Sequence, residues 1–158
     1  MNIQQLTYPT TTVISLQEAK DHLRVTSDDE DSLIKDCING ATNLVETYTN
    51  QYLLSRTFVA YFDTLEAYQN IEIWKYPISA ISSVKYINTS GVETTLSTDN
   101  YSADIIDSPS RLYFTSVPTV KSNIYNAFRV YFTAGYSDRD NISPELINWV
   151  KIFVGFFY

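Results

Sequence analysis

Residues Ser15 to Ile34, S-L-Q-E-A-K-D-H-L-R-V-T-S-D-D-E-D-S-L-I, decide how the fold begins. Twice in this stretch a serine is followed three residues later by a glutamate: Ser15 by Glu18, and Ser27 by Glu30. This spacing is typical of a capping box, in which the two side chains bind free backbone N–H groups at the start of a helix. The stretch therefore predicts a short helix over 16–23 and a second helix capped by Ser27.

The second predicted helix is long and amphipathic. Acidic residues fill its first turn at 28–30, where the positive end of the helix dipole favours negative charge. Apolar residues then recur at helical spacing as far as the neighbourhood of Asn50, where we expect the helix to end. The stripe that we expect to be buried consists of Leu33, Cys37, Ala41, Leu44 and Tyr48, widened by Ile34, Ile38 and Val45.

Beyond Asn50 the apolar period changes to two, which is typical of β-strands. Between two of the strands, residues 88–91 (N-T-S-G) predict a hairpin turn with Gly91 in the left-handed conformation. We expect Gly135 to end the last strand with a positive φ. The alternation predicts short strands over 57–62, 71–74, 84–87, 92–96, 101–105, 111–114 and 128–133.

A third helix is predicted to open at Ser143, with Pro144 at its first position. From Leu146 onward only Asn148 and Lys151 interrupt its apolar surface. A helix that is apolar on all sides needs cover on all sides, either from its own chain or from a neighbouring subunit or partner. The chain stops without a C-cap or a polar tail, so we expect the natural chain to continue beyond Tyr158. The aromatic residues of this helix can therefore belong either to the core of their own chain or to a contact with a neighbouring subunit or partner. They are Trp149, Phe153, Phe156, Phe157 and Tyr158.

The order of these elements predicts an α+β fold, in which an N-terminal helical pair and a C-terminal helix pack with an antiparallel β-rich middle. Residues 1–12 are polar and contain four threonines, so we expect an N-terminal arm that is ordered only if something holds it. Residues 13–158 are expected to form a single domain, because a chain of this length buries about two thirds of its unfolded surface.

The composition excludes several classes of functional site. No two of the four glycines lie within 15 residues of each other, which excludes glycine-rich nucleotide loops and a G-x-S-x-G nucleophile turn. One histidine and one cysteine exclude paired-histidine metal sites, an intrachain disulfide and cysteine-based zinc sites. Eleven scattered basic residues and a net charge of −7 disfavour a free-standing nucleic-acid binder. We detect no signal peptide and no apolar run long enough for a transmembrane span.

The remaining chemistry-bearing residues favour structural roles. His22 has no serine or cysteine nucleophile at a recognisable spacing, so a surface or packing role is favoured over catalysis. Cys37 lies on the apolar stripe and is expected to act as a small buried hydrophobe. The acidic run 28–31 lacks the glycine and glutamate of an EF-hand, which favours capping over metal binding, with a partner-facing acidic patch as the alternative. Two aspartate pairs lie in turn-like segments, where aspartate is common for local backbone reasons: Asp104 with Asp107, and Asp138 with Asp140.

Several motifs follow one another in a characteristic order. They are S-L-Q-E-A-K-D-H-L-R-V at 15–25 before the acidic helix start, V-E-T-Y-T at 45–49, Y-P-I at 76–78 before I-S-S-V-K-Y at 81–86, and V-Y-F-T-A-G-Y at 130–136 before S-P-E-L at 143–146. Together they resemble the head–tail connector (adaptor) proteins of long-tailed bacteriophages, over roughly residues 13 to 158. Members of that family commonly continue past the final helix with a polar or charged tail, which this sequence lacks.

The resemblance implies a structural virion protein that is not an enzyme and uses no cofactor or metal. Such adaptors form a homo-oligomeric ring, usually a dodecamer in the virion, beneath the portal protein. The ring extends the channel through which DNA passes without sequence-specific binding, and it recruits a stopper or tail-completion protein. The implied location is the virion neck at the head–tail interface, and the host cytoplasm during assembly, with no membrane association.

The high aromatic content and low charge also fit large interfaces, whose cores favour aromatic side chains and lose charge. Two other functions stay open: a different neck or tail-completion protein of related fold, and a small acidic enzyme with an aromatic pocket. The enzyme would have a deep pocket with convergent polar groups and a perturbed titrating residue, whereas the adaptor would have broad apolar flanks. The candidate subunit or partner contacts are Trp149, Phe153, Phe156, Phe157 and Tyr158, with Asp28, Asp29 and Asp31.

Overall fold

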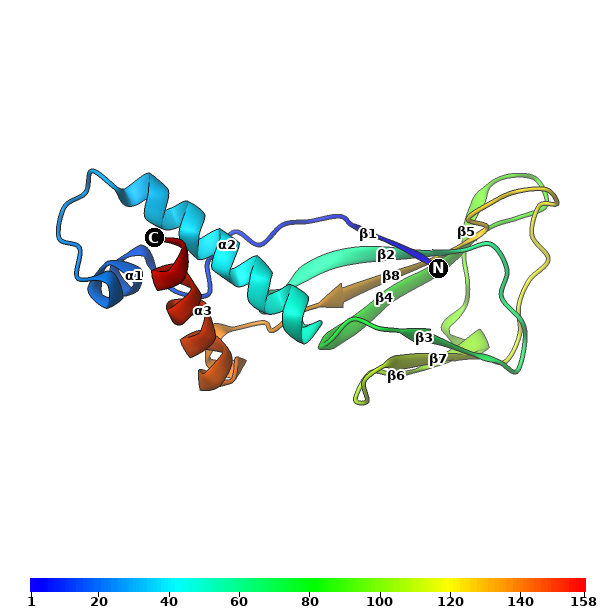
Figure 1. Ribbon diagram of the computed structural model, residues 1–158. Coiled ribbons are helices and arrows are strands. Elements are labelled where there is room, and N and C mark those ends of the chain that lie inside the picture. Colours follow the sequence, from blue (N-terminus) through cyan, green and yellow to red (C-terminus); the bar gives the residue numbers. More distant parts are fainter. The chain divides into compact units, whose positions relative to one another are not determined.

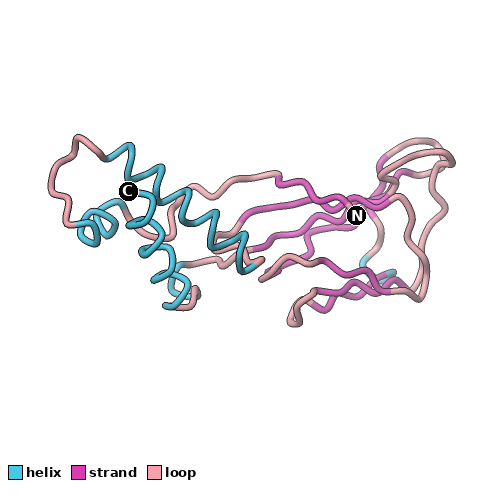
Figure 2. Tube along the Cα trace, viewed as in Figure 1, coloured by secondary structure: helices cyan, strands magenta, loops and turns pink.

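The computed structural model describes residues 1–158, which form two compact units (Figure 1). Residues 1–8 and 56–135 form the β unit, and residues 9–55 and 136–158 form the helical unit. All strands lie in the β unit and all α-helices in the helical unit, as Figure 2 shows. The fold is therefore the predicted α+β class, with helices from both ends of the sequence and a β-rich middle. The single domain over 13–158 stays a prediction.

Three helices that contact one another pairwise form the helical unit: α1 (Leu16–Leu23), α2 (Asp31–Thr49) and α3 (Pro144–Phe157). A short 3₁₀ turn, Arg139–Asn141, precedes α3. Pro144 stands at the start of α3, as its fixed φ and missing N–H predict. The hydrophobic core of the unit contains Val13, Ile14, Ala19, Ile34, Cys37, Ile38, Ala41, Val45, Leu53, Leu54, Ile142, Val150 and Val154, and three polar residues, Lys20, Thr42 and Glu46, are buried as well.

The first capping box is confirmed. The Ser15 hydroxyl accepts a hydrogen bond from the Glu18 N–H (3.1 Å), and the Glu18 carboxylate accepts one from the Ser15 N–H (2.9 Å). The predicted helix bounds 16–23 are also those of α1. At the far end of α2, Asn50 takes the left-handed conformation that commonly stops a helix, where the sequence predicted the stop.

The second capping box is wrong. Helix α2 begins at Asp31 with Glu30 at the cap position, and no side chain caps it. The Ser27 hydroxyl instead binds the N–H and the carboxylate of Asp29, within the turn that precedes the helix. The Glu30 carboxylate that the box requires instead accepts a hydrogen bond from the Tyr158 hydroxyl, and the Lys20 ammonium of α1 holds the turn by ion pairs with Asp28 and Asp31.

The buried side of α2 is also different from the predicted stripe. Cys37 and Ala41 are buried as expected, but Leu33, Leu44 and Tyr48 are exposed. Ile34, Ile38 and Val45, which widen the predicted stripe, are also buried as expected, where α1 and α3 pack. The predicted stripe is therefore too wide, because the packing of the other two helices covers only one side of it. The apolar side chains of that buried face are Ile34, Cys37, Ile38, Ala41 and Val45.

Two antiparallel sheets form the β unit, in which the predicted strands all occur, most with small changes of boundary, although the strand predicted over 84–87 begins six residues earlier, at Ile78. The five-stranded sheet has the order β1 (Asn2–Gln5), β2 (Arg56–Phe62), β8 (Phe128–Ala134), β4 (Ile78–Ile87), β5 (Glu93–Thr95). The three-stranded sheet has the order β3 (Asn70–Ile73), β7 (Ser110–Phe114), β6 (Tyr101–Asp104). The buried side chains of the two sheets form the core, and they include Phe58, Ile73, Val84, Leu112, Phe114, Phe128, Val130 and Phe132.

The N-terminal arm and the turns of the β unit are held by backbone pairing. Strand β1, within the predicted arm, pairs with the edge of β2. The hairpin turn after β4 has Gly91 at φ +83°, as predicted, and the last strand ends at Gly135 with φ +103°. The 115–126 connection lies beside that hairpin turn, because Asn88 and Val120 form a β-bridge. None of the helices combines the length and apolar character needed to cross a membrane.

An aromatic face on the helical unit

Helix α3 has one buried side and one exposed aromatic side. Val150 and Val154 are fully buried against the core of the helical unit, and Phe153 packs beside them half-buried. Leu146 and Ile147 also pack half-buried against that core, whereas Phe156 is 79% exposed and Ile152 is 60% exposed. Trp149, Phe157 and Tyr158 are exposed as well, so most of the predicted contact residues lie on the surface of the subunit.

An apolar groove lies where α3 meets the end of α2. It has a volume of about 420 Å³, and Tyr48, Trp149, Ile152 and Phe153 line it. The rings of Tyr48 and Trp149 meet edge to face, with their centroids 6.5 Å apart. Tyr48 is 82% exposed, so the groove is open to solvent along that side.

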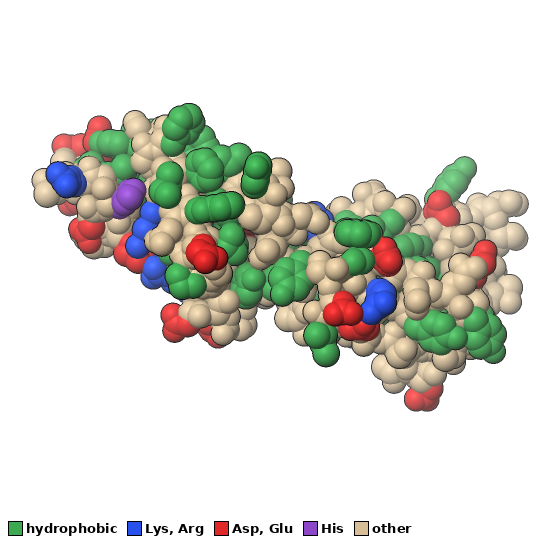
Figure 3. Space-filling model, turned by 60° about the horizontal axis from the view of Figure 1, so that its bottom comes forward, with side chains coloured by type: hydrophobic (Ala, Val, Ile, Leu, Met, Phe, Trp, Pro, Cys, Tyr) green, Lys and Arg blue, Asp and Glu red, His purple; other side chains and the backbone are tan.

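Further along the same two helices, the Phe157 ring lies against α2 at Gly40. A side chain at Gly40 would meet the Phe157 ring at 3.6 Å, and the Phe157 ring also lies edge to face against that of Phe156. The Tyr158 hydroxyl donates a hydrogen bond to Glu30, and this bond raises the pKa of the tyrosine. In the space-filling view of Figure 3, hydrophobic side chains gather on the surface of the helical unit. We call the exposed residues Tyr48, Trp149, Ile152, Phe156, Phe157 and Tyr158, with half-buried Phe153, the aromatic face.

The acidic candidates lie in the turn before α2. Lys20 is only 5% exposed, and its ammonium binds Asp28 at 2.5 Å and Asp31 at 2.8 Å. The two contacts raise the pKa of Lys20, and the ammonium lowers that of Asp28. Asp29 makes its hydrogen bonds with Ser27 and stays exposed. All three candidate aspartates therefore have a partner within the chain, and two of them form an ion pair with Lys20.

The Glu18 carboxylate binds several groups that hold the helical unit together. The sequence predicted only its contact with Ser15. Its carboxylate accepts the Ser15 N–H, binds Arg139 at 2.5 Å and lies 3.7 Å from the ammonium of Lys151 on α3. The Ser15 hydrogen bond and the nearby cations lower the pKa of Glu18 to about 2. No local signal could have revealed Arg139, because it lies 121 residues further along the chain.

The other titratable candidates do not form a reactive centre. Cys37 is a buried free thiol, as expected. His22 lies on α1 beside α3, where a Cβ added at Gly155 would be 3.7 Å from its Nε2. No group of three or more His, Cys, Asp and Glu side chains is arranged to hold a metal ion. Asp138 and Asp140 flank the start of the 3₁₀ turn before α3.

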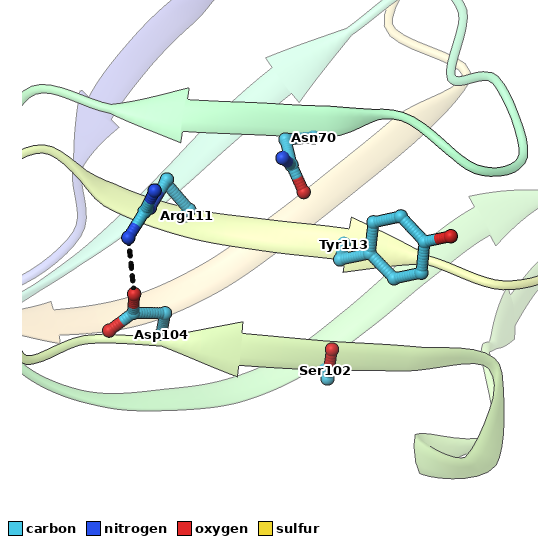
Figure 4. Close-up of a pocket in the computed structure, with 5 residues that line it drawn as sticks. All are labelled: Asn70, Ser102, Asp104, Arg111 and Tyr113. Carbon is cyan, nitrogen blue, oxygen red and sulfur yellow. Dashed lines mark hydrogen bonds and ion pairs between the residues drawn. The ribbon is translucent and has the colours of Figure 1, made fainter.

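The remaining aspartate pair lies on the outer face of the three-stranded sheet. Arg111 on β7 binds Asp104 at 2.7 Å, as Figure 4 shows, and lowers the pKa of Asp104. Arg111 also binds Asp107 at 2.9 Å. The Asp104 contact lies in a shallow hollow of about 170 Å³, whose other lining residues are Asn70, Ser102 and Tyr113. An arginine between two aspartates offers neither a free base nor a nucleophile, so the arrangement is that of a surface ion pair.

Negative charge is concentrated in the helical unit. That unit has five basic and eleven acidic residues, a net charge of −6, whereas the β unit has six basic and seven acidic residues, a net charge of −1. The aromatic face thus belongs to the strongly acidic part of the molecule. A broad exposed apolar surface of this kind is typical of an interaction site.

Comparisons with known proteins agree with this description. The structure matches a subunit in the neck of an empty gene transfer agent particle, reconstructed with C6 symmetry, with a TM-score of 0.85 and 19% sequence identity. The match covers 100% of this chain and 84% of the other. The neck of the native particle with C12 symmetry matches with a TM-score of 0.80 and 18% identity, over 100% and 83% of the two chains. At these identities the likeness establishes a shared fold.

Sequence comparison establishes the family. A search of curated proteins found no match. The profile of the phage gp6-like head–tail connector proteins matches residues 13–108, which is more than half of the chain. The match begins just before the capping box of α1 and ends in the three-stranded sheet region. The resemblance seen in the sequence motifs is thereby confirmed, and the chain belongs to the phage gp6-like head–tail connector protein family.

Proposed function

We propose that this head–tail connector protein is the adaptor of a phage neck, where it joins the portal protein to the stopper or tail-completion protein and extends the DNA channel. The observation that carries the proposal is the family match, supported by a fold shared along the whole chain with subunits of particle necks. The role is structural and non-catalytic. The virion neck is its final location, and the host cytoplasm is where it is made and assembled.

The adaptor functions as a closed ring, which a single heterologous contact builds by repetition around the axis. The necks that share the fold were reconstructed with sixfold and twelvefold symmetry, which supports a ring and favours twelve subunits. Exposed apolar surface on the subunit supports extensive contacts, because scattered apolar residues are ordinary on a monomer but a contiguous patch marks an interaction site.

The helical unit is the part that docks on a neighbouring virion component, the portal protein. Its contacts come from the aromatic face, chiefly Trp149, Phe153, Phe156, Phe157 and Tyr158. The turn with Asp28, Asp29 and Asp31 adds polar contacts at the edge. The loops of the β unit at 88–91 and 115–126 receive the next protein of the neck.

DNA passes through such a ring without sequence-specific binding. The net charge of −7 supports this, because a channel lining that neutralised phosphates would hold the DNA and slow its passage. Of the eleven basic residues, six already form ion pairs within the chain. The protein therefore offers few free cations to a phosphate backbone.

Electron microscopy of the protein mixed with purified portal rings of the same particle tests the proposal. The expected result is an added ring layer on the portal, coaxial with its channel. The double variant Phe156→Ser/Phe157→Ser separates a docking role from a core role. If these residues make contacts, the variant keeps its monomer stability and loses the added layer. A matched control is Ile106→Ser in the β unit, which removes an exposed apolar side chain and should leave the layer intact. Absence of any added layer with the unmodified protein would refute the adaptor function.

A further inference from the structure

The groove on the aromatic face is a preformed receptor for an apolar side chain. Tyr48 and Trp149 hold each other edge to face on one side, and Ile152 and Phe153 complete the lining. A hollow of about 420 Å³ is large enough for one or two apolar side chains. Nothing in the chain itself fills it.

Acidic side chains flank the aromatic face at both ends. Glu145 stands four residues before Trp149, so it lies on the same side of α3. Asp36 stands four residues before Gly40, where the Phe157 ring packs, and Glu30 binds the Tyr158 hydroxyl. The only basic residue of α3, Lys151, lies against Glu18 of α1 and is partly buried there. The face therefore has an apolar centre and an acidic margin.

A second copy of this chain offers few cations to complement that margin, because only Arg24 and Lys35 of the helical unit form no ion pair and they lie in a unit with a net charge of −6. Three of the five basic residues of the helical unit are bound to its own acids, namely Lys20, Arg139 and Lys151. In the β unit, Lys85 and Arg129 are paired with Glu93, and Arg111 is paired with two aspartates. Two helical units that each carry a net charge of −6 also repel each other.

We propose that the groove binds an apolar side chain presented on a basic surface of a different protein, and not a second copy of this chain. The inference rests on the proposed adaptor function, in which the helical unit docks on a neighbouring virion component, and it specifies the chemistry of that component. Its docking surface carries lysines or arginines around a protruding apolar residue. Charge steers the two surfaces together, and burial in the groove holds them.

A tryptophan-fluorescence assay tests this proposal, because the chain has two tryptophans and they lie in different units. In the full-length Trp74→Phe variant, Trp149 in the groove is the sole indole. The probes are three amphipathic peptides of about four helical turns. The first has leucines on one face and lysines on the other, the second has glutamates in place of the lysines, and the third has serines in place of the leucines.

The leucine–lysine peptide is expected to bind at about 50 mM salt and to shift Trp149 emission to shorter wavelength. Raising the salt to about 0.5 M should weaken binding at least tenfold, because the Debye length falls below 5 Å. Ile152→Ser should weaken binding about tenfold by removing one apolar wall of the groove. Glu145→Gln with Asp36→Asn should weaken it several-fold. Ile152 is largely exposed, so its variant keeps the fold, and Ile106→Ser in the β unit is the matched control that binds as the parent does.

Three results would overturn the proposal. Equal binding of the leucine–glutamate peptide would show that charge is irrelevant. Equal binding of the serine–lysine peptide, or unchanged binding by Ile152→Ser, would show that the groove is not the site. Concentration-dependent self-association in sedimentation experiments, abolished by Ile152→Ser, would identify a second copy as the occupant. The peptide assay is independent of portal docking, so a ring layer without peptide binding refutes only this inference, and peptide binding without a ring layer refutes only the adaptor function.

Discussion

Replacement of Glu18 by glutamine should destabilise the helical unit at neutral pH and have almost no effect in strong acid. The carboxylate caps α1 through the Ser15 N–H and binds the guanidinium of Arg139 just before α3. Glutamine has nearly the same shape but no charge. It therefore removes the electrostatic part of these contacts and leaves the packing in place.

The size of the effect follows from the pKa of Glu18, which is lowered from 4.5 to about 2. A difference of that size corresponds to about 3 kcal/mol between the charged and neutral forms. Water reaches the partly exposed Arg139 and screens the pair, so we expect about 1–2 kcal/mol of the free energy of unfolding to be lost. Because the pKa is lowered in the folded state, this stabilisation is complete above pH 4.5 and disappears as the pH falls towards 2.

Urea unfolding followed by Trp149 fluorescence in the Trp74→Phe background measures the helical unit. The Glu18→Gln variant should unfold at lower urea than its parent at pH 7, and the two should converge as the pH approaches 2. Glu145→Gln is the matched control, because Glu145 also lies in the first turn of a helix but makes no ion pair, and it should change stability by less than about 0.5 kcal/mol. An equal loss at pH 7 and at pH 2 would refute the electrostatic explanation.

Four further outcomes can be checked with the same protein. Val154→Ala, at a fully buried position, should cost about 2 kcal/mol in urea unfolding, whereas Phe156→Ala on the exposed side of α3 should cost less than about 0.5 kcal/mol; equal costs would contradict the assigned sides of the helix. Gly91→Ala should lower stability by about 1 kcal/mol in thermal or urea unfolding, because the turn requires φ +83° there, and a neutral result would count against that turn. Lys20→Met should speed amide exchange in the turn that contains Asp28, measured by hydrogen–deuterium exchange, with no change in the β unit. The Cys37 thiol should react with a thiol reagent only when the helical unit unfolds, and rapid labelling of the native protein would show that the site is not buried.

Local signals predicted the parts of the fold that depend on neighbouring residues in sequence. The Ser15–Glu18 box, the left-handed Gly91 and the proline that opens α3 each satisfy backbone groups within a few residues, so their patterns are sufficient. The predicted strands were also confirmed, because the alternation of apolar and polar residues along a strand indicates which of its sides is buried. The second capping box failed because distant groups bind the acids of that turn: the Tyr158 hydroxyl binds Glu30, and the Lys20 ammonium binds Asp28 and Asp31.

Features that depend on contacts between distant segments could not be predicted. The stripe predicted on α2 is wider than its buried face, and only the packing of α1 and α3 leaves Leu33 and Tyr48 in solvent. The aromatic residues of α3 were identified as contact candidates from composition alone. Their division into a buried and an exposed side, and the groove with Tyr48, required the structure. Arg139 binds Glu18 although 121 residues separate them in the sequence, and no spacing rule predicts such a pair.

A cryo-electron microscopy reconstruction of the neck of the particle that contains this protein tests the central claim most directly. We expect a closed ring of copies with this fold, stacked between the portal and the next neck protein, with Trp149 and Ile152 buried against a neighbouring protein. A neck in which this fold is absent, or in which it occurs outside the ring that surrounds the DNA channel, would contradict the account.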